Sequence, residues 1–224
     1  MNITIDPNFS VYSLVTRVKK RKTAEVHHRR TMNIISNEIE NATLRDGAES
    51  RIFAGFQNMS RFLPQMERYA QLAPKAEGVY VFGVPDVQVP PIDNLHYIEL
   101  SPNDRLAQEW FILSYGKDFF SALATEELSH IEDDDGERIF EGVWTFDASL
   151  TSILETWLTR VVDAKPMMII EAQLNQNMQK RYIHSILQRL QRRMETEPTT
   201  LAHQRIHEEV AAIIEADVKP MATL

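Results

Sequence analysis

Several polar side chains next to predicted apolar surfaces are the residues of this chain best placed to form a ligand-binding or catalytic site. A guanidinium, phenol or imidazole group beside an apolar surface can bind a small molecule through a polar contact combined with packing. The same residue types also serve as structural groups whose hydrogen bonds are satisfied inside the fold. The candidates are Arg61, Tyr69, Tyr80, His96, Tyr115 and His130.

Motifs that carry phosphate or nucleophile chemistry are missing from the sequence. The seven glycines form neither a P-loop nor a dinucleotide-binding fingerprint, and no Gly-x-Ser-x-Gly elbow occurs. The catalytic motifs of histidine kinases and cyclases are also absent. Because the chain has no cysteine, it cannot form a disulfide, a thiolate nucleophile or a thioether-linked chromophore. We therefore expect a protein that is not an enzyme and that carries no cofactor.

Two groups of residues resemble metal-binding patterns only in part. His203 and His207 lie four residues apart on one face of a predicted helix, but the intervening acid of the metalloprotease motif is absent. Asp133–Asp135 are consecutive, whereas the acids of a calcium loop alternate so that they surround the ion. We expect no bound metal, and we interpret the aspartates as the solvated tip of a hairpin.

A basic segment and an acidic segment differ strongly in charge. Residues 17–30 contain seven Lys or Arg and one Glu, whereas eight of the sixteen residues 126–141 are acidic and only Arg138 among them is a Lys or Arg. The basic segment could contact an acidic partner, a nucleic acid or an anionic membrane. Alternatively, it is a solvated helix end whose cations stabilise the helix C-terminus. The formal net charge of −8 weighs against nucleic-acid binding.

Length and composition are those of a globular protein. A chain of 224 residues with 43% hydrophobic and 25% charged residues suits one domain with helical extensions, or two small domains. The N-terminus lacks the regions of a signal peptide, and no apolar run approaches the length of a membrane span. We expect a cytoplasmic protein with no membrane contact.

The predicted fold is a mixed α/β (α+β) domain built around Glu109–Asp147, which indicates three strands joined by two turns. Short apolar runs upstream add two strands, giving a largely antiparallel sheet of about five strands. Helices at 51–72, with a kink or break near Pro64, and at 148–162, with Trp157 on its buried side, are expected to cover one face. The predicted strands are 79–84, 95–100, 110–115, 119–125 and 139–146.

Helices are also expected at both ends of the chain. One begins at Asp6-Pro7 and carries an apolar stripe from Val11 to Val18, another covers 25–41, and 166–195 and 201–218 form a C-terminal helical hairpin broken at Pro198. The long helix exceeds the radius of the sheet domain, so its apolar stripe predicts a homodimer closed by a four-helix bundle. In the competing account the hairpin packs on its own domain. The stripe comprises Ile170, Leu174, Met178, Ile183, Leu187, Leu190 and Met194.

Several segments resemble the DICT sensory domain. They are Phe53–Gln57 with Ser60–Phe62, then Tyr69 and Val79–Gly83, and later Ile112–Gly116, Phe119–Glu127 and Gly142–Phe146. The resemblance covers about residues 40–165, and we divide the chain into an N-terminal helical segment (1–42), a DICT-like domain (43–164) and the C-terminal hairpin (165–224). DICT domains occur in bacterial diguanylate cyclases and two-component systems, prominently in cyanobacteria, beside catalytic or photoreceptor modules.

The resemblance implies a signalling role. The leading hypothesis is a non-enzymatic sensor or adaptor in a two-component or cyclic-dinucleotide pathway, with a link to light. It would act through a histidine kinase, a response regulator or a diguanylate cyclase. The alternative is a small-molecule-binding protein or enzyme whose site is assembled from scattered residues of the α/β domain.

Overall fold

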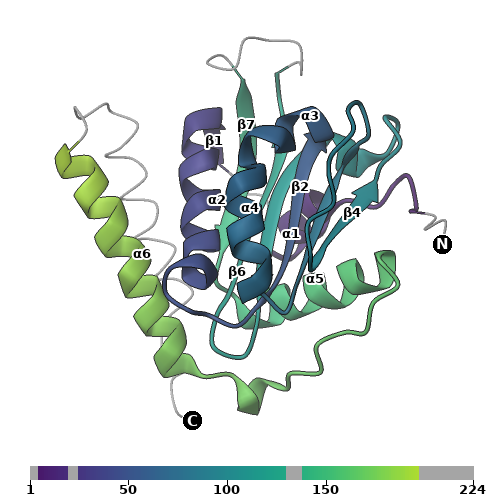
Figure 1. Ribbon diagram of the computed structural model, residues 1–224. Coiled ribbons are helices and arrows are strands. Elements are labelled where there is room, and N and C mark those ends of the chain that lie inside the picture. Colours follow the sequence, from purple (N-terminus) through teal and green to yellow (C-terminus); the bar gives the residue numbers. More distant parts are fainter. Residues whose placement is uncertain (1–4, 20–24, 130–137, 197–224) are drawn as a thin grey trace.

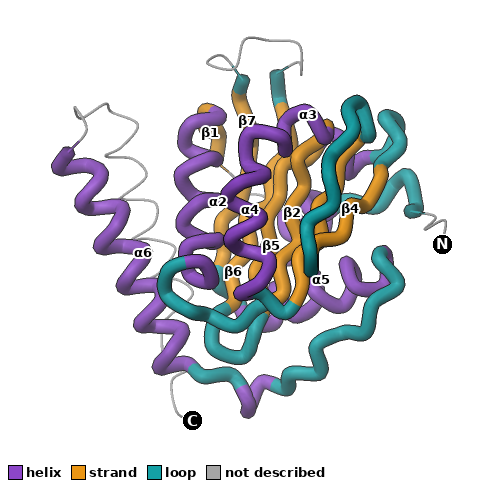
Figure 2. Tube along the Cα trace, viewed as in Figure 1, coloured by secondary structure: helices purple, strands orange, loops and turns teal. Residues whose placement is uncertain are grey.

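A seven-stranded mixed sheet forms the centre of the molecule. The computed structural model describes residues 5–19, 25–129 and 138–196. The strand order is β1-β7-β6-β5-β2-β3-β4 (Figures 1 and 2). The strands are β1 (Glu25–His28), β2 (Arg51–Asn58), β3 (Gly78–Val84), β4 (Leu95–Glu99), β5 (Glu109–Tyr115), β6 (Phe120–Glu127) and β7 (Ile139–Thr145).

The sheet is largely antiparallel, as predicted. Strands β1, β7, β6, β5 and β2 pair antiparallel in that order, and β3 and β4 then add in parallel to the far side of β2. The five predicted strands are all present. Two more were missed because both lie in segments that were predicted to be helical.

Strand β2 is the larger of these corrections. The chain from Arg51 to Asn58 was assigned to a helix at 51–72, but it is a central strand buried on both faces. Ile52 packs into one core cluster and Phe53 into the other. An apolar run of this length fits a buried strand and a buried helix equally well, so periodicity could not separate them.

A true helical segment follows β2. Helix α3 (Met59–Phe62) leads through a 3-10 turn, η2 (Leu63–Gln65), into helix α4 (Met66–Leu72). The break predicted near Pro64 is therefore confirmed. A second 3-10 turn, η3 (Ala73–Lys75), connects α4 to β3, and η4 (Arg105–Gln108) precedes β5.

Helices cover both faces of the sheet, which corrects the expectation that the predicted pair would share one face. Helices α1 (Val11–Lys19) and α5 (Ala148–Val161) pack on one face. Helix α1 begins later than the predicted start at Asp6-Pro7, where the chain instead makes a turn. Helices α2 (Arg29–Leu44), α4 and α6 (Gln176–Thr196) pack on the other (Figure 1). The segment 25–41 was predicted to be one helix, but it begins with β1, and α2 starts only at Arg29.

Helix α1 is fixed to the sheet by a buried carboxylate. The hydroxyl of Ser10 and the backbone N–H groups of Val11 and Tyr12 donate to the carboxylate of Glu109, with N–O distances of 3.0 and 3.1 Å. Burial raises the pKa of Glu109 to about 7, and the three hydrogen bonds oppose that rise. The carboxylate of Glu109 on β5 thus accepts hydrogen bonds from N–H groups at the start of α1 that have no partner within the helix.

Helix α5 begins at the predicted cap, since the side chain of Asp147 accepts from the backbone N–H of Leu150 at 2.9 Å. Its buried stripe is Leu150, Leu154 and Leu158. Trp157 is 41% exposed, so the prediction that it faces the core is wrong. Its ring instead contacts Phe9, with centroids 5.7 Å apart. The buried leucines, one every four residues, cover a narrower part of the helix surface than all the apolar positions of α5 together. Trp157 lies at the edge of this buried part.

Helix α6 is shorter than predicted and is packed on its own domain. Residues 166–175 are non-helical apart from the 3-10 turn η5 (Glu171–Gln173). The predicted stripe is therefore divided. Ile183 and Leu190 are buried in the core cluster that contains α2, and Met178 and Leu187 pack partly buried against it. Ile170 is exposed.

The expectation that the stripe is partly exposed on a monomer is thus wrong for Ile183 and Leu190, which pack on their own domain as in the competing account, whereas Ile170 is exposed as expected. Leu174 contacts the opposite core cluster, ahead of the helix. The side chain of Met194 and the second hairpin helix at 201–218 lie outside the described residues.

Polar contacts add to the apolar docking of α6. The side-chain amide of Gln179 donates to the carbonyl of Phe120 at 2.9 Å and accepts from its N–H at 3.0 Å. Arg189 pairs with Glu38 on α2 at 2.5 Å and with Asp46 at 2.8 Å. These bonds fix both the start and the middle of α6 to the domain.

Candidate functional site

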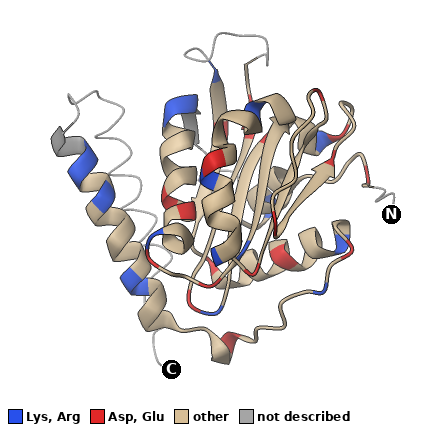
Figure 3. Cartoon of the chain, viewed as in Figure 1, with Lys and Arg blue, Asp and Glu red and all other residues tan. Residues whose placement is uncertain are grey.

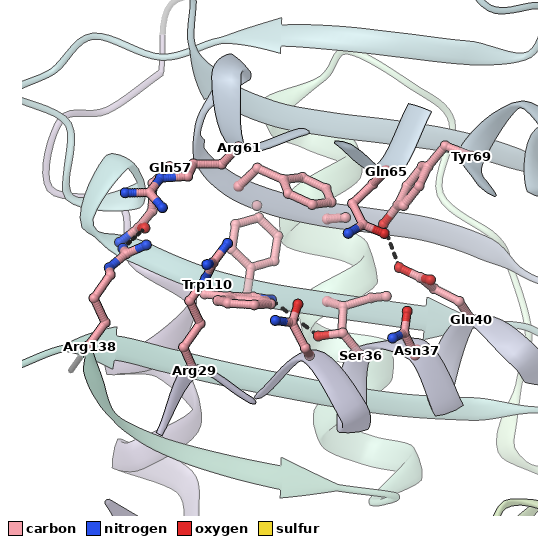
Figure 4. A pocket seen from close by; sticks show the side chains of 16 residues that line it. Arg29, Ser36, Asn37, Glu40, Gln57, Arg61, Gln65, Tyr69, Trp110 and Arg138 are labelled. Carbon is pink, nitrogen blue, oxygen red and sulfur yellow. Dashed lines mark hydrogen bonds between the residues drawn. The ribbon is translucent and has the colours of Figure 1, made fainter. Parts of the chain in front are cut away.

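A hollow lies between the helical layer and the sheet. Strands β2 and β5 form its floor through Ala54, Phe56 and Trp110, while α2 and the α3–α4 segment form its walls (Figure 4). It contains roughly 570 Å³ of space not occupied by atoms, its open mouth included.

Aromatic side chains held in place by neighbours line the middle of the hollow. Trp110 donates from its indole N–H to the hydroxyl of Ser36 at 3.1 Å, and its ring meets Phe140 edge-on. Phe56 meets Phe62 and Tyr69 edge-on, with centroids 5.2 and 5.6 Å apart. Both Trp110 and Phe56 are only partly buried. Their rings therefore present a fixed apolar surface to the hollow.

A buried ion pair stands at one end of the hollow. Arg138, 1% exposed, donates to both carboxylate oxygens of Glu127 at 2.7 and 2.6 Å. It also donates to the side-chain oxygen of Gln57 at 2.5 Å, and its guanidinium lies 5.3 Å from the ring centre of Phe140. Although burial alone raises the pKa of Glu127, the hydrogen bonds from Arg138 and Gln57 outweigh it and lower the pKa.

The backbone of Gln57 makes this network possible. Its φ is +65°, and the pairing of β2 with β3 shifts register between Gly55 and Asn58. A left-handed residue in a strand redirects its side chain. The amide of Gln57 consequently donates to Glu127 at 2.7 Å and to the carbonyl of Gln108 at 3.3 Å.

Two more arginines line the same end. Arg29 is the first residue of α2, and its backbone N–H donates to the carbonyl of Arg138 at 3.1 Å. Arg61 projects from α3. Figure 4 shows the guanidinium groups of Arg29, Arg61 and Arg138 toward one end of the hollow, with Trp110 between them and Glu40. This end can bind an anionic group.

The other end is acidic and closed by hydrogen bonds. Glu40 on α2 accepts from the phenol of Tyr69 at 2.8 Å and pairs with Arg68 on α4. Burial raises the pKa of Glu40 above its ordinary value, although Arg68 and Tyr69 act in the opposite direction. Burial and the nearby Glu40 carboxylate together hold the pKa of Tyr69 well above its usual range. Tyr69 is thus a neutral hydrogen-bond donor throughout the physiological range.

Only some of the candidate residues chosen from the sequence meet at this site. Arg61 and Tyr69 both line the hollow. Tyr80, His96 and Tyr115 do not, because Tyr80 and Tyr115 pack on the opposite face of the sheet. There Phe53, Tyr80 and His96 stack across three paired strands, each pair of rings 5.0 Å apart. His130 lies outside the described residues.

Sequence reasoning missed most of the remaining lining. Ser36, Glu40 and Gln57 gave no signal, because a polar residue inside a helix or strand pattern does not show where it points. Arg138 gave a partial signal, because it is the cation within an otherwise acidic segment. Arg29 was counted only as part of the basic segment, with no role in a site.

No metal centre and no membrane span occur in the part of the chain that the structure describes. Within residues 5–19, 25–129 and 138–196, no three His, Asp or Glu side chains are grouped so that they could hold a metal ion. None of the helices in those residues is long and apolar enough to cross a bilayer. His203 and His207 are outside the described residues, as is the aspartate run at 133–135.

The fold and the hollow define a mixed α/β domain with an open, aromatic-lined hollow between its sheet and one helical layer. The model of the DICT family, a sensory domain in diguanylate cyclases and two-component systems, matches residues 8–128. Since this is more than half of the chain, the protein belongs to the DICT family. The match begins at residue 8, before the segment 40–165 that resembles the family in sequence, and ends at residue 128, so it includes α1, β1 and α2 but not Gly142–Phe146. No curated protein and no solved structure matches the chain.

Proposed function

We propose that the protein is a non-enzymatic sensor that binds a small molecule in the hollow and passes the signal on through α6. The family is one of sensory domains, and the hollow supplies a preformed site. This proposal joins the sensor hypothesis with the alternative of a ligand-binding protein. A catalytic role has no comparable support, since the sequence carries no motif for one.

The observation that carries the proposal is the position of α2 between the hollow and α6. Glu40 and Glu38 are two residues apart on this helix, so their side chains leave it on different sides. Glu40 lines the hollow, whereas Glu38 is buried against α6 and pairs with Arg189. A shift of α2 caused by a ligand would therefore change the contact that fixes α6.

The outer side of α6 suits an acidic protein partner. Lys180 and Arg181 are exposed there, and the helix carries further basic residues along its length (Figure 3). We propose that the partner is a histidine kinase, a response regulator or a diguanylate cyclase, the types of protein in which this family is found. A cytoplasmic location and a link to light-dependent signalling belong to the same proposal. So does a homodimer, for which exposed Trp157, Met168 and Ile170 offer apolar surface.

Small-molecule extraction from the purified protein tests the sensing step. We expect a compound that is released on denaturation and identified by mass spectrometry. It should be lost from Asn33→Trp, which places a large ring into the hollow from α2. The control is Gln71→Trp on the exposed side of α4, which should retain the compound. A compound kept equally by both variants would place binding elsewhere.

A pull-down tests the output step. The charge reversals Lys180→Glu and Arg181→Glu should abolish capture of the signalling partner while leaving the fold unchanged by circular dichroism. Light scattering of the full chain measures the dimer. Turnover of a nucleoside triphosphate or cyclic dinucleotide by the pure protein, removed by a point mutation, would contradict the non-enzymatic role.

A further inference from the structure

We propose that the hollow selects a small planar organic molecule carrying one acidic group. The acidic group would lie at the arginine end, and the planar part would lie against Trp110 and Phe56. This inference rests on the proposed function and names the ligand class of the same site. Charge, shape and hydrogen-bonding capacity of the lining each support it separately.

Charge determines where an acidic group can bind. Three of the four charged side chains that line the hollow are arginines, Arg29, Arg61 and Arg138, and they lie toward the same end. A guanidinium has five N–H donors in a fixed plane, so it can bind a carboxylate or phosphate while keeping another contact. Arg138 uses its donors on Glu127 and Gln57. Arg29 and Arg61 are assigned to the ligand because, unlike Arg138, both are partly exposed where they line the hollow.

Glu40 limits the ligand to one acidic group. Its carboxylate lies at the opposite end and is bonded to Tyr69 and paired with Arg68. A second acid on the ligand would approach this buried carboxylate, and like charges at short range in a poorly solvated site repel strongly. A hydroxyl or amide at that end of the ligand would meet no such penalty.

The shape of the lining favours a planar body. Trp110 and Phe56 are partly exposed although both pack against the core cluster, because the hollow lies over them. The hydrogen bond to Ser36 and the edge-on rings around Phe56 keep both side chains in place. A flat ring can therefore stack there without rearranging the site.

Side-chain amides supply the remaining polar contacts. Asn33, Asn37 and Gln65 line the hollow, and their amides make no hydrogen bond to any other described residue. Each offers both a donor and an acceptor. Three such groups around an aromatic floor suit a ligand with polar substituents on its ring edge.

Calorimetry with 4-hydroxybenzoate and its neutral analogue 4-hydroxybenzamide tests the inference on the full chain. We expect 4-hydroxybenzoate to bind with a Kd on the order of 1 mM or tighter, and the amide at least about tenfold more weakly. Arg61→Gln should weaken the acid at least about tenfold without changing binding of the amide. The matched control is Arg105→Gln, which removes an equal charge from an exposed pair outside the hollow and should leave binding unchanged.

Fluorescence locates the bound probe. Binding should change the emission of the wild type, and Trp110→Phe should remove most of that change, because the other tryptophans are outside the lining. Equal affinity for acid and amide, with Trp110 still reporting both, would overturn the acidic ligand class and leave small-molecule sensing intact. Equal weakening by Arg61→Gln and Arg105→Gln would also overturn it. Binding of neither probe, with no compound released from the purified protein, would reject the proposed function itself.

Discussion

Replacement of Arg138 by methionine should be among the most destabilising single changes in the described part of this protein. The side chains of Arg138 and Glu127 are 1% and 5% exposed, and the guanidinium makes three short hydrogen bonds to Glu127 and Gln57. Without Arg138, Glu127 keeps its buried charge and loses its partner. Removal of one member of a buried pair costs about 3–5 kcal/mol, and we expect that loss in the free energy of unfolding at neutral pH.

The pH dependence gives this prediction a distinctive sign. In the wild type the pKa of Glu127 is lowered, so its pairing stabilises the fold above the ordinary pKa of a glutamate, about 4.3, and that contribution is lost as the pH falls through the lower, folded-state value. In Arg138→Met the unpaired, buried carboxylate takes up a proton more readily. The difference between wild type and variant should therefore shrink as the pH is lowered from neutral toward about 5.

Urea unfolding followed by circular dichroism measures both effects. The double variant Glu127→Gln, Arg138→Met should recover part of the loss, because no unpaired charge remains buried. Arg105→Met is the control, since Arg105 and Glu126 form an exposed pair whose removal should cost less than about 1 kcal/mol. A loss of under about 1 kcal/mol for Arg138→Met, or a deficit that does not change with pH, would refute the reasoning.

Three further changes test other parts of the fold by the same unfolding measurement. Leu154→Ala should cost about 2–5 kcal/mol, whereas Trp157→Ala should cost about 1 kcal/mol because that ring is 41% exposed; equal losses would contradict the assigned face of α5. Burial raises the pKa of Glu109 to about 7, so ionisation should cost stability, up to about 3 kcal/mol, as the pH rises from about 4.5 to 7. Glu109→Gln should flatten this slope, and parallel curves would contradict it. Gly116→Ala places Cβ 2.1 Å from the carbonyl oxygen of Glu49 and should cost about 3 kcal/mol; a neutral result would contradict this close packing.

The sequence was sufficient to predict most helices and strands, but not which parts of the protein pack against them. The meander from β5 to β7 and the cap at Asp147 follow from local turn and capping chemistry, and all are present. The apolar positions of α6 correctly predicted a helix with a buried side. They did not reveal what covers that side, because a stripe looks the same whether a second chain or the helix's own domain packs on it.

The site was the least predictable part because its residues come together only through tertiary contacts. Arg61 and Tyr69 could be selected as polar groups near apolar surfaces, and they line the hollow. Tyr80 satisfied the same criterion and faces the other side of the sheet. The orientation of Gln57 depends on a left-handed backbone angle in a residue type that rarely adopts it, so no local pattern would have indicated it.

The pairing of β1 with β7 has a consequence for the order in which the protein can fold during synthesis. Glu25 lies opposite Gly142 in the sheet, so the first strand to leave the ribosome must wait until more than half of the chain has been made. At typical rates of protein synthesis this interval is on the order of ten seconds. During it, strands β2 to β6 can already pair with one another, because all of them precede β7 in the chain. We therefore expect β1 to join the sheet last among the strands, and a released chain truncated before residue 139 to assemble β2 to β6 with the β6 edge of the sheet open.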